Sequence, residues 1–129
     1  MNSEEIIKKH PKSVKIIIEW FTKKMFESFK DKENTVPEEV KHYMEQRGVS
    51  NEQLITFINI NPRVFFDVFD NKNILIGIEP VEKNNFSNYI IDNGVRSPIS
   101  KRYNSRINCE KGGFERAINL LEKKLSNEK

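Results

Sequence analysis

The sequence predicts one α+β domain, in which an N-terminal bundle of three to four helices is followed by a three-stranded antiparallel sheet backed by a C-terminal helix. Two observations carry this prediction. Apolar residues recur at helical spacing through residues 1–70, and the pattern then changes to short apolar runs between turn residues. A chain of 129 residues normally forms one domain, so we expect 1–70 to be its helical part and 71–129 its β-β-β-α part.

The first 30 residues predict a short helix and then a long one. Ser3 is a suitable N-cap for a helix that ends before Pro11, because the residue preceding a proline disfavours helical backbone. The long helix is expected from about Lys12 to Lys30, with one apolar face. Three more apolar residues widen that face, which predicts burial on two sides or an oligomer interface: Ile16, Trp20 and Phe26.

Capping signals divide the rest of the helical part into short helices. Thr35–Glu38 and Ser50–Gln53 are capping boxes, in which the first and fourth side chains each accept a hydrogen bond from the other residue's backbone. Asn61 followed by Pro62 predicts a cap and the first helical residue of a last short helix.

Two strands are expected next, over Ile74–Glu79 and Phe86–Ile91, because both runs are short, apolar and rich in isoleucine or aromatic residues. The polar residues 80–85 are expected to connect them. Asp92-Asn93-Gly94 predicts a turn after the second strand, because asparagine and glycine adopt positive φ at low cost.

A third strand is expected over residues 99–109. Ile99, Tyr103 and Ile107 would share its buried face, with Cys109 continuing it, and the alternate residues would face water. The pair Gly112-Gly113 would end this strand. An apolar stripe at helical spacing then predicts the last helix, from Phe114 to about Ser126, which would cover the sheet.

A basic surface is expected in residues 93–111, which hold five basic side chains against Glu110, a net charge of +4. Guanidinium groups on the wet face of a strand grip phosphates or carboxylates through two hydrogen bonds. Such a face is a solvated surface, a site for an acidic protein partner, or a nucleic-acid site. The candidate binding residues are Arg96, Lys101, Arg102, Asn104 and Arg106.

Residues 36–70 also have the helix lengths of a helix-turn-helix unit, as in many small DNA-binding repressors. Two features argue against that use. Ile55 stands where such units usually hold a small residue, because the two helices cross closely there. The unit also carries a net charge of −3, and DNA affinity depends largely on neutralising phosphates.

The sequence holds no group of residues with a convincing catalytic or metal-binding pattern, so we expect no enzyme activity, no metal and no cofactor. The two histidines, His10 and His42, have no metal-ligand spacing. Cys109 would lie on the buried face of its strand, which favours a structural thiol over a nucleophile. Asp67 and Asp70 are three residues apart, but at a helix end beside aromatic residues they are more typical of a solubilising end.

The composition predicts a soluble cytoplasmic protein. A single cysteine excludes a disulfide within the chain. No run of apolar residues approaches the length of about 18 that a membrane-spanning helix needs. The N-terminus lacks the apolar core of a signal peptide. The isoleucine-rich, alanine-poor composition is typical of low-GC bacteria and their phages. We therefore expect a non-catalytic binding or regulatory protein that acts through a protein partner or self-association. Nucleic acid is the alternative partner, and no small-molecule substrate or membrane is expected.

Overall fold

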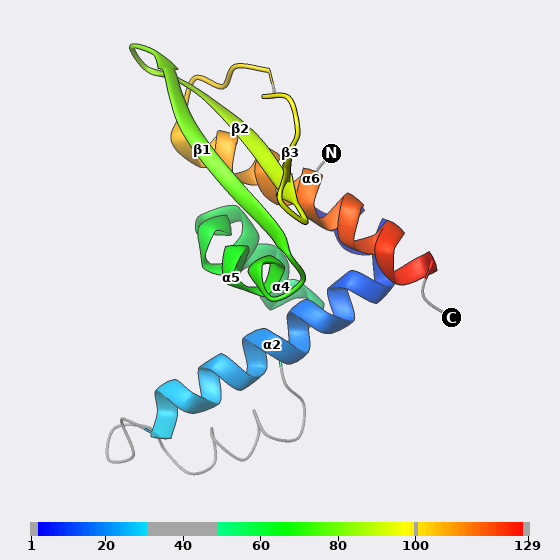
Figure 1. Cartoon of the computed structure of the whole chain (residues 1–129). Helices are drawn as coiled ribbons and strands as arrows, with labels where there is room; N and C mark the ends of the chain where they lie inside the picture. Colours follow the sequence, from blue (N-terminus) through cyan, green and yellow to red (C-terminus); the bar gives the residue numbers. More distant parts are fainter. Residues whose placement is uncertain (1–2, 31–48, 100, 128–129) are drawn as a thin grey trace.

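The computed structural model of the chain describes residues 3–30, 49–99 and 101–127 (Figure 1). It confirms the α+β class: a three-stranded antiparallel sheet with strand order β1-β2-β3 is backed by the C-terminal helix. In chain order the elements are α1 (Ser3–Lys9), α2 (Pro11–Lys30), α4 (Asn51–Ile60), the 3-10 helix η1 (Pro62–Phe65), α5 (Phe66–Asp70), β1 (Ile74–Glu82), β2 (Asn85–Asp92), β3 (Val95–Arg96) and α6 (Arg106–Asn127).

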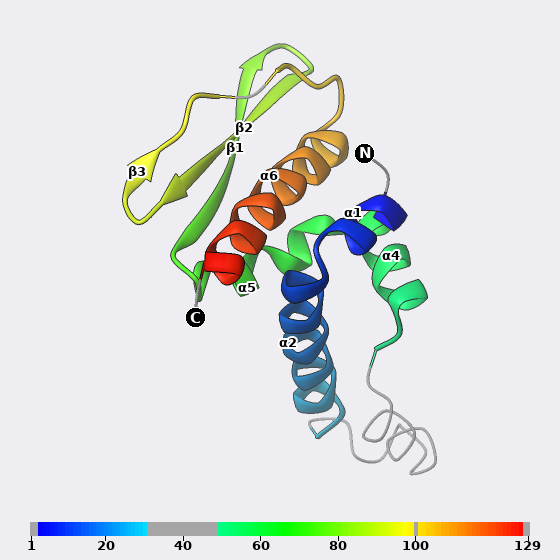
Figure 2. The same cartoon turned by 90° about the vertical axis from the view of Figure 1, so that its right-hand side faces the viewer.

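Helix α6 is the central element of the fold. It lies between the sheet on one side and helices α1, α2 and α4 on the other (Figure 2). It contacts β1, β2, α2, η1 and α5. The side chains that α6 buries therefore belong to both layers, and they hold the helical part against the sheet.

The helical predictions are largely confirmed. The short and long helices occur as α1 and α2. At the start of α4 both hydrogen bonds of the Ser50–Gln53 capping box are formed. Pro62 is the first residue of η1, but the predicted cap is wrong in one respect, because the Asn61 side chain makes no capping hydrogen bond. The helix predicted after Thr35 lies outside the described residues, as does part of the proposed helix-turn-helix unit.

The first two strands are longer than predicted, because the connector expected over residues 80–85 is mostly strand. Pro80 lies within β1, a bulge follows it, and the chain reverses at Lys83 and Asn84, where Asn84 adopts a φ of 65°. The predicted turn after β2 is confirmed, with Asn93 at φ 50° and Gly94 at φ 85°.

The strand predicted over residues 99–109 is wrong. The third strand is the two-residue β3, Tyr103 forms only an isolated bridge with Phe86, and α6 has begun by Arg106. A spacing of four residues fits a helix as well as a strand, so Ile99, Tyr103 and Ile107 did not distinguish the two. Ser105 begins the helix, because its Oγ accepts a hydrogen bond from the Asn108 backbone N–H at 3.2 Å.

Gly112 and Gly113 do not end an element but lie inside α6. A Cβ on Gly112 would stand 2.3 Å from the Tyr103 hydroxyl, and one on Gly113 would stand 2.7 Å from Ile76 Cγ2. Each glycine costs a helix about 1 kcal/mol relative to alanine. Here that cost is offset by packing, since only residues without a side chain let α6 approach the sheet so closely.

A row of phenylalanines forms the centre of the core. The ring centroids of Phe57 and Phe21 are 4.8 Å apart, those of Phe21 and Phe65 5.1 Å, and those of Phe65 and Phe114 5.9 Å. Phe69 meets Phe114 from the other side at 5.5 Å. The row links α4, α2, η1, α6 and α5, and Phe65, Phe69 and Phe114 are fully buried.

The junction of α1 and α2 is fastened to α6 by polar contacts. His10 is 4 % exposed, and its ring nitrogens lie 2.6 Å from the Ile6 carbonyl oxygen and 2.5 Å from Asn119 Oδ1. The Ser13 backbone N–H donates to Glu122 Oε1 at 2.9 Å. Because the first turn of α2 has no acidic residue of its own, the Glu122 carboxylate supplies the negative charge that a helix N-terminus favours.

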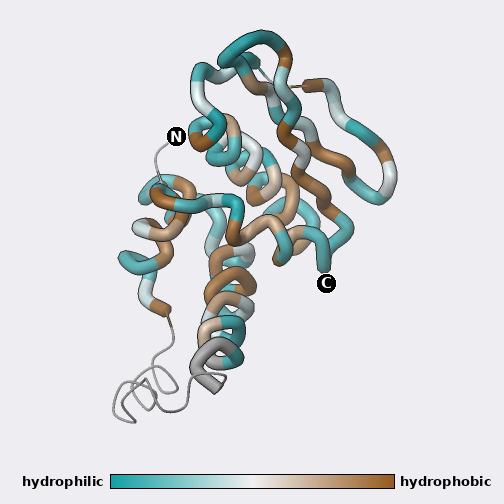
Figure 3. Tube along the Cα trace, turned by 90° about the vertical axis from the view of Figure 1, so that its left-hand side faces the viewer, coloured by the Kyte–Doolittle hydropathy of each residue, from teal (hydrophilic) through white to brown (hydrophobic). Residues whose placement is uncertain are grey.

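The hydrophobic segments gather where α2, η1, α5 and the strands meet, and the turn between β1 and β2 is hydrophilic (Figure 3). Within the described ranges, no helix combines the length and the apolarity needed to cross a membrane.

The close contact at Gly113 gives a stability prediction. Gly113→Ala is expected to lower the free energy of unfolding by about 1–3 kcal/mol, the usual cost of overpacking, although in an open helix the same change would stabilise by about 1 kcal/mol. Chemical denaturation measures the difference. In Gly113→Ala/Ile76→Ala the new methyl group has room, so the two changes should be clearly non-additive. A Gly113→Ala protein more stable than the wild type would contradict this packing.

Candidate functional site

The two edges of the sheet can be assigned from its register. In an antiparallel pair, residues alternate between those whose backbone groups face the partner strand and those that face away. Phe86 of β2 exchanges backbone hydrogen bonds of 2.9 and 2.8 Å with Tyr103, so Phe86, Asn88 and Ile90 face away from β1. Their partners in the register therefore face away from β2: Pro80, Ile78 and Ile76.

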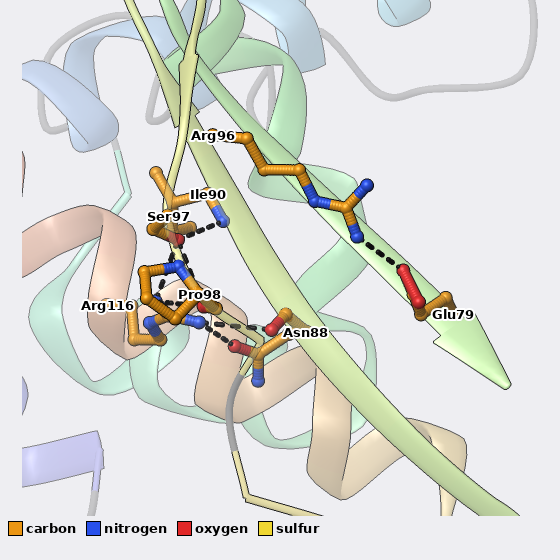
Figure 4. Close-up of polar contacts among 7 residues, drawn as sticks. All are labelled: Glu79, Asn88, Ile90, Arg96, Ser97, Pro98 and Arg116. Carbon is orange, nitrogen blue, oxygen red and sulfur yellow. Dashed lines mark hydrogen bonds and ion pairs between the residues drawn. The ribbon is translucent and has the colours of Figure 1, made fainter. Parts of the chain in front are cut away.

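The β2 edge is closed by several short contacts rather than by one long strand. Next to Tyr103, the Arg116 guanidinium donates to the Asn88 carbonyl at 3.0 Å and to Asn88 Oδ1 at 2.9 Å. Its other nitrogen donates to Ser97 Oγ at 2.8 Å and to the Pro98 carbonyl at 3.1 Å (Figure 4). The backbone N–H of Ile90 donates to Ser97 Oγ at 3.0 Å, and the Ile90 carbonyl accepts from the Ser97 backbone N–H at 2.7 Å. Arg116 thus takes the place of a missing strand residue.

Asn88 joins this edge to α6. The residue is 0 % exposed, and an amide so deeply buried needs hydrogen-bond partners. Its Nδ2 donates to the Cys109 carbonyl at 3.1 Å, its Oδ1 accepts from Arg116, and its side chain also hydrogen-bonds that of Tyr103. The β2 edge is therefore part of the interior of the molecule.

The β1 edge is different. Among the described residues, no hydrogen bond reaches the outward N–H and C=O groups of Ile76 and Ile78. Pro80 has no N–H to offer, and the bulge between Pro80 and Glu82 interrupts the strand beyond it. The open part of this edge therefore runs from Ile76 to Pro80. Proline within a strand run is typical of an edge, so Pro80 is the sequence signal that could have located it.

A groove of about 420 Å³ lies beside the first half of this open edge. One side is the outer face of β1 and β2, and the other side is η1 and α5; the lining residues include Arg63, Phe66, Asp67, Asp70, Leu75 and Tyr89. Tyr89 lies over Gly77, where a Cβ would approach the ring to within 2.0 Å. Arg96 in turn lies 4.0 Å above the Tyr89 ring centroid.

Two carboxylates, of Asp67 and Asp70, line the groove. Within the described part of the chain, neither Asp67 nor Asp70 has an ion pair or a side-chain hydrogen bond. Burial, and to a smaller extent the charge of Asp67, raise the pKa of the Asp70 carboxyl above its ordinary value. A positive charge placed here would favour the ionised form of Asp70.

The predicted binding residues do not share one sheet face, because the strand that was to carry them does not form. Three of the four cations are paired with glutamates: Arg96 with Glu79 at 2.7 Å, Arg102 with Glu82 at 2.7 Å, and Arg106 with Glu110 at 3.4 Å. Lys101 lies 5.3 Å from the Tyr103 ring centroid, and Asn104 is exposed. Arg116, which organises this region, was not among the predicted residues.

A second cavity, of about 610 Å³, lies between α1, α4, residues 101–103 and α6. Lys101 and Lys111 of the basic segment line it together with Glu4 and Glu115. Burial raises the pKa of the Tyr103 hydroxyl, so this group stays neutral. Charges of both signs line the cavity, and it therefore does not select a charged ligand.

The predicted oligomer face of the long helix is only partly visible. Ile16 and Trp20 are partly buried and pack against the core, and Lys24 lies 5.9 Å from the Trp20 ring centroid. The side chain of Phe26 lies outside the described part of the structure. Self-association through this face stays a prediction.

The groups considered for catalysis are held in structural contacts. Cys109 is 0 % exposed, and burial raises the pKa of its thiol, which makes it a weak nucleophile. His10 is fixed between Ile6 and Asn119, and His42 lies outside the described residues. In the ranges that the structure covers, no three His, Cys, Asp or Glu side chains are grouped to hold a metal ion.

Comparisons of the chain with protein-family models, with curated proteins and with solved structures find no match. Function is therefore inferred from the geometry of the sheet edges and of the groove.

The burial of Cys109 gives a reactivity prediction. Native protein is expected to react with a thiol reagent at mildly alkaline pH at least about a hundredfold more slowly than the chain in denaturant, because the thiol is both enclosed and less ionised. The time course of labelling measures the ratio, and the denatured chain is the control. Equal rates would show an accessible thiolate and would reopen the nucleophile hypothesis.

Proposed function

We propose that the protein is a small non-catalytic binding protein, and that a protein partner adds an extended segment to the open edge of β1. The single observation that carries the proposal is the contrast between the two sheet edges. Arg116, Ser97, β3 and Tyr103 satisfy the β2 edge, whereas Ile76 and Ile78 leave their outward backbone groups without partners among the described residues.

Strand addition suits such an edge. An extended segment of another chain hydrogen-bonds the outward backbone groups, and its alternate side chains provide specificity. Each main-chain hydrogen bond contributes about 0.5–1.5 kcal/mol net. The bulge and Pro80 limit the open length, so the hydrogen bonds alone give weak binding, and contacts in the neighbouring groove must add to it.

A nucleic-acid partner has less support. Protein–DNA affinity depends on cations that are free to neutralise phosphates. Glu79, Glu82 and Glu110 already neutralise Arg96, Arg102 and Arg106 at 2.7 to 3.4 Å. The net charge of 93–111 therefore overstates the positive field that this surface presents.

A pull-down from the native host tests the proposal. Ile78→Pro removes the outward N–H of that residue without removing a hydrogen bond between β1 and β2. It is expected to lose the captured protein. Ile78→Thr shortens the same side chain but keeps the N–H, so it serves as the matched control and should retain the protein. Unchanged circular dichroism and thermal unfolding establish that both variants fold.

Two results would overturn the proposal. In one, Ile78→Pro captures as much of the protein as the wild type does. In the other, nuclease treatment of the lysate removes the captured material, as expected if nucleic acid were the partner.

A further inference from the structure

We infer that the segment added at β1 is basic, and that its Lys or Arg side chains lie against Asp67 and Asp70 in the groove beside the strand. This inference rests on the proposed strand addition and names the chemistry of the partner. It concerns a part of the molecule that the basic segment 93–111 does not include.

The position of the groove supports the inference. It is bounded by η1 and α5 on one side and by residues 75–77 of β1 on the other, and α5 lies beside the first half of β1 (Figure 1). A segment paired with Ile76 and Ile78 would run along the mouth of this groove. Its side chains alternate between two faces, so every second one would lie on the groove side.

The charges in the groove favour a cation. Elsewhere on the sheet, Glu79, Glu82 and Asp92 are each paired with a basic side chain. Asp67 and Asp70 have no such partner among the described residues. With Arg63, they give the groove three charged side chains and a net charge of −1. Both carboxylates are exposed, so an incoming ammonium or guanidinium group can reach them and form a charge-assisted hydrogen bond.

The apolar part of the groove also suits a basic side chain. Leu75, Tyr89 and Ile91 line it, and Leu75 is 46 % exposed although it lies in a strand. Lysine and arginine fit this surface, because their methylene stems cover apolar surface while the charged end stays at the rim.

A second copy of the chain fits this edge poorly. Antiparallel pairing about a two-fold axis at Gly77 would bring Glu79 and Glu82 of the second copy to the end of β1 that flanks Asp67 and Asp70. In that register Glu79 lies opposite Leu75, and it is already paired with Arg96, so a second copy brings no unpaired cation to the groove. The phosphates of a nucleic acid would be repelled by Asp67 and Asp70. The occupant is therefore a different chain, extended and basic.

Synthetic peptides test this directly. The probe is an acetylated and amidated octapeptide of alternating valine and lysine, compared with one of alternating valine and glutamate, with calorimetry as the measurement. The lysine peptide is expected to bind at least about tenfold more tightly, as one charge-assisted hydrogen bond provides. The lysine peptide with N-methylated backbone amides should not bind, because it cannot donate to β1.

Charge-reversed variants of the groove, measured with the same two peptides, are the second test. Asp67→Lys/Asp70→Lys is expected to reverse the preference, so that the glutamate peptide binds more tightly. Glu52→Lys, an exposed change of the same sign on α4, is the control and should keep the original order. Both substitutions lie on helix surfaces, and circular dichroism verifies folding.

The outcomes separate this inference from the proposed function. If both peptides bind equally and Ile78→Pro abolishes both, strand addition stands and the preference for a basic segment is overturned. If the lysine peptide binds regardless of Ile78→Pro and of N-methylation, the attraction is merely electrostatic and the inference is overturned. If neither peptide binds, the basic preference is overturned as well, and the pull-down alone then decides the proposed function.

Discussion

The close approach of α6 to the sheet at Gly112 and Gly113 is the constraint on which the rest of the structure depends. A side chain at these positions would collide with Ile76 and Tyr103, so the helix or the groups that face it would have to shift. At the observed separation, Asn88 reaches the Cys109 carbonyl and Arg116 reaches the backbone of β2. The polar groups of the β2 edge are therefore satisfied by α6 and its preceding loop, and this edge is no longer available to another chain.

The same helix determines what happens at the other edge. Phe114 of α6 meets both Phe65 and Phe69, which fixes η1 and α5 beside β1. The outward backbone groups of Ile76 and Ile78 keep no partner in the part of the chain that the structure describes. The sheet thus has one edge closed by its own chain and one edge flanked by a short helix, whose two carboxylates have no ion pair within the described ranges. This asymmetry follows from packing, and the proposed function follows from the asymmetry.

Local signals made the helical part predictable, while contacts distant in sequence decided the rest. The Ser50–Gln53 box fixes the start of α4 within four residues, and the turn at Asn93 and Gly94 follows from the positive φ that these two residues adopt at low cost. By contrast, the sequence alone predicts that Gly112 and Gly113 end a strand. Their packing partners, which are Ile76, Asn88 and Tyr103, are not adjacent to them in the sequence. The strand expected over 99–109 failed for a related reason, since a four-residue spacing does not separate strand from helix.

The proposed binding site differs from the one predicted in residues 93–111, and the reason is electrostatic. The positive charges of residues 93–111 are conspicuous in the sequence, but the fold places Glu79 and Glu82 next to Arg96 and Arg102. The carboxylates of Asp67 and Asp70, which the sequence predicts to be a solubilising helix end, have no ion pair among the residues that the structure covers. Net charge along a segment therefore did not predict the charge that the folded surface presents.

Residue-resolved amide hydrogen exchange on the native protein compares the two edges most directly. The N–H groups of Phe86 and Ile90 are hydrogen-bonded at the closed edge and should be strongly protected. The N–H of Ile78 faces the open edge and should exchange far faster, although it lies in the middle of a nine-residue strand. Protection of Ile78 equal to that of Ile90 would mean that the β1 edge is already paired, and it would contradict the central claim.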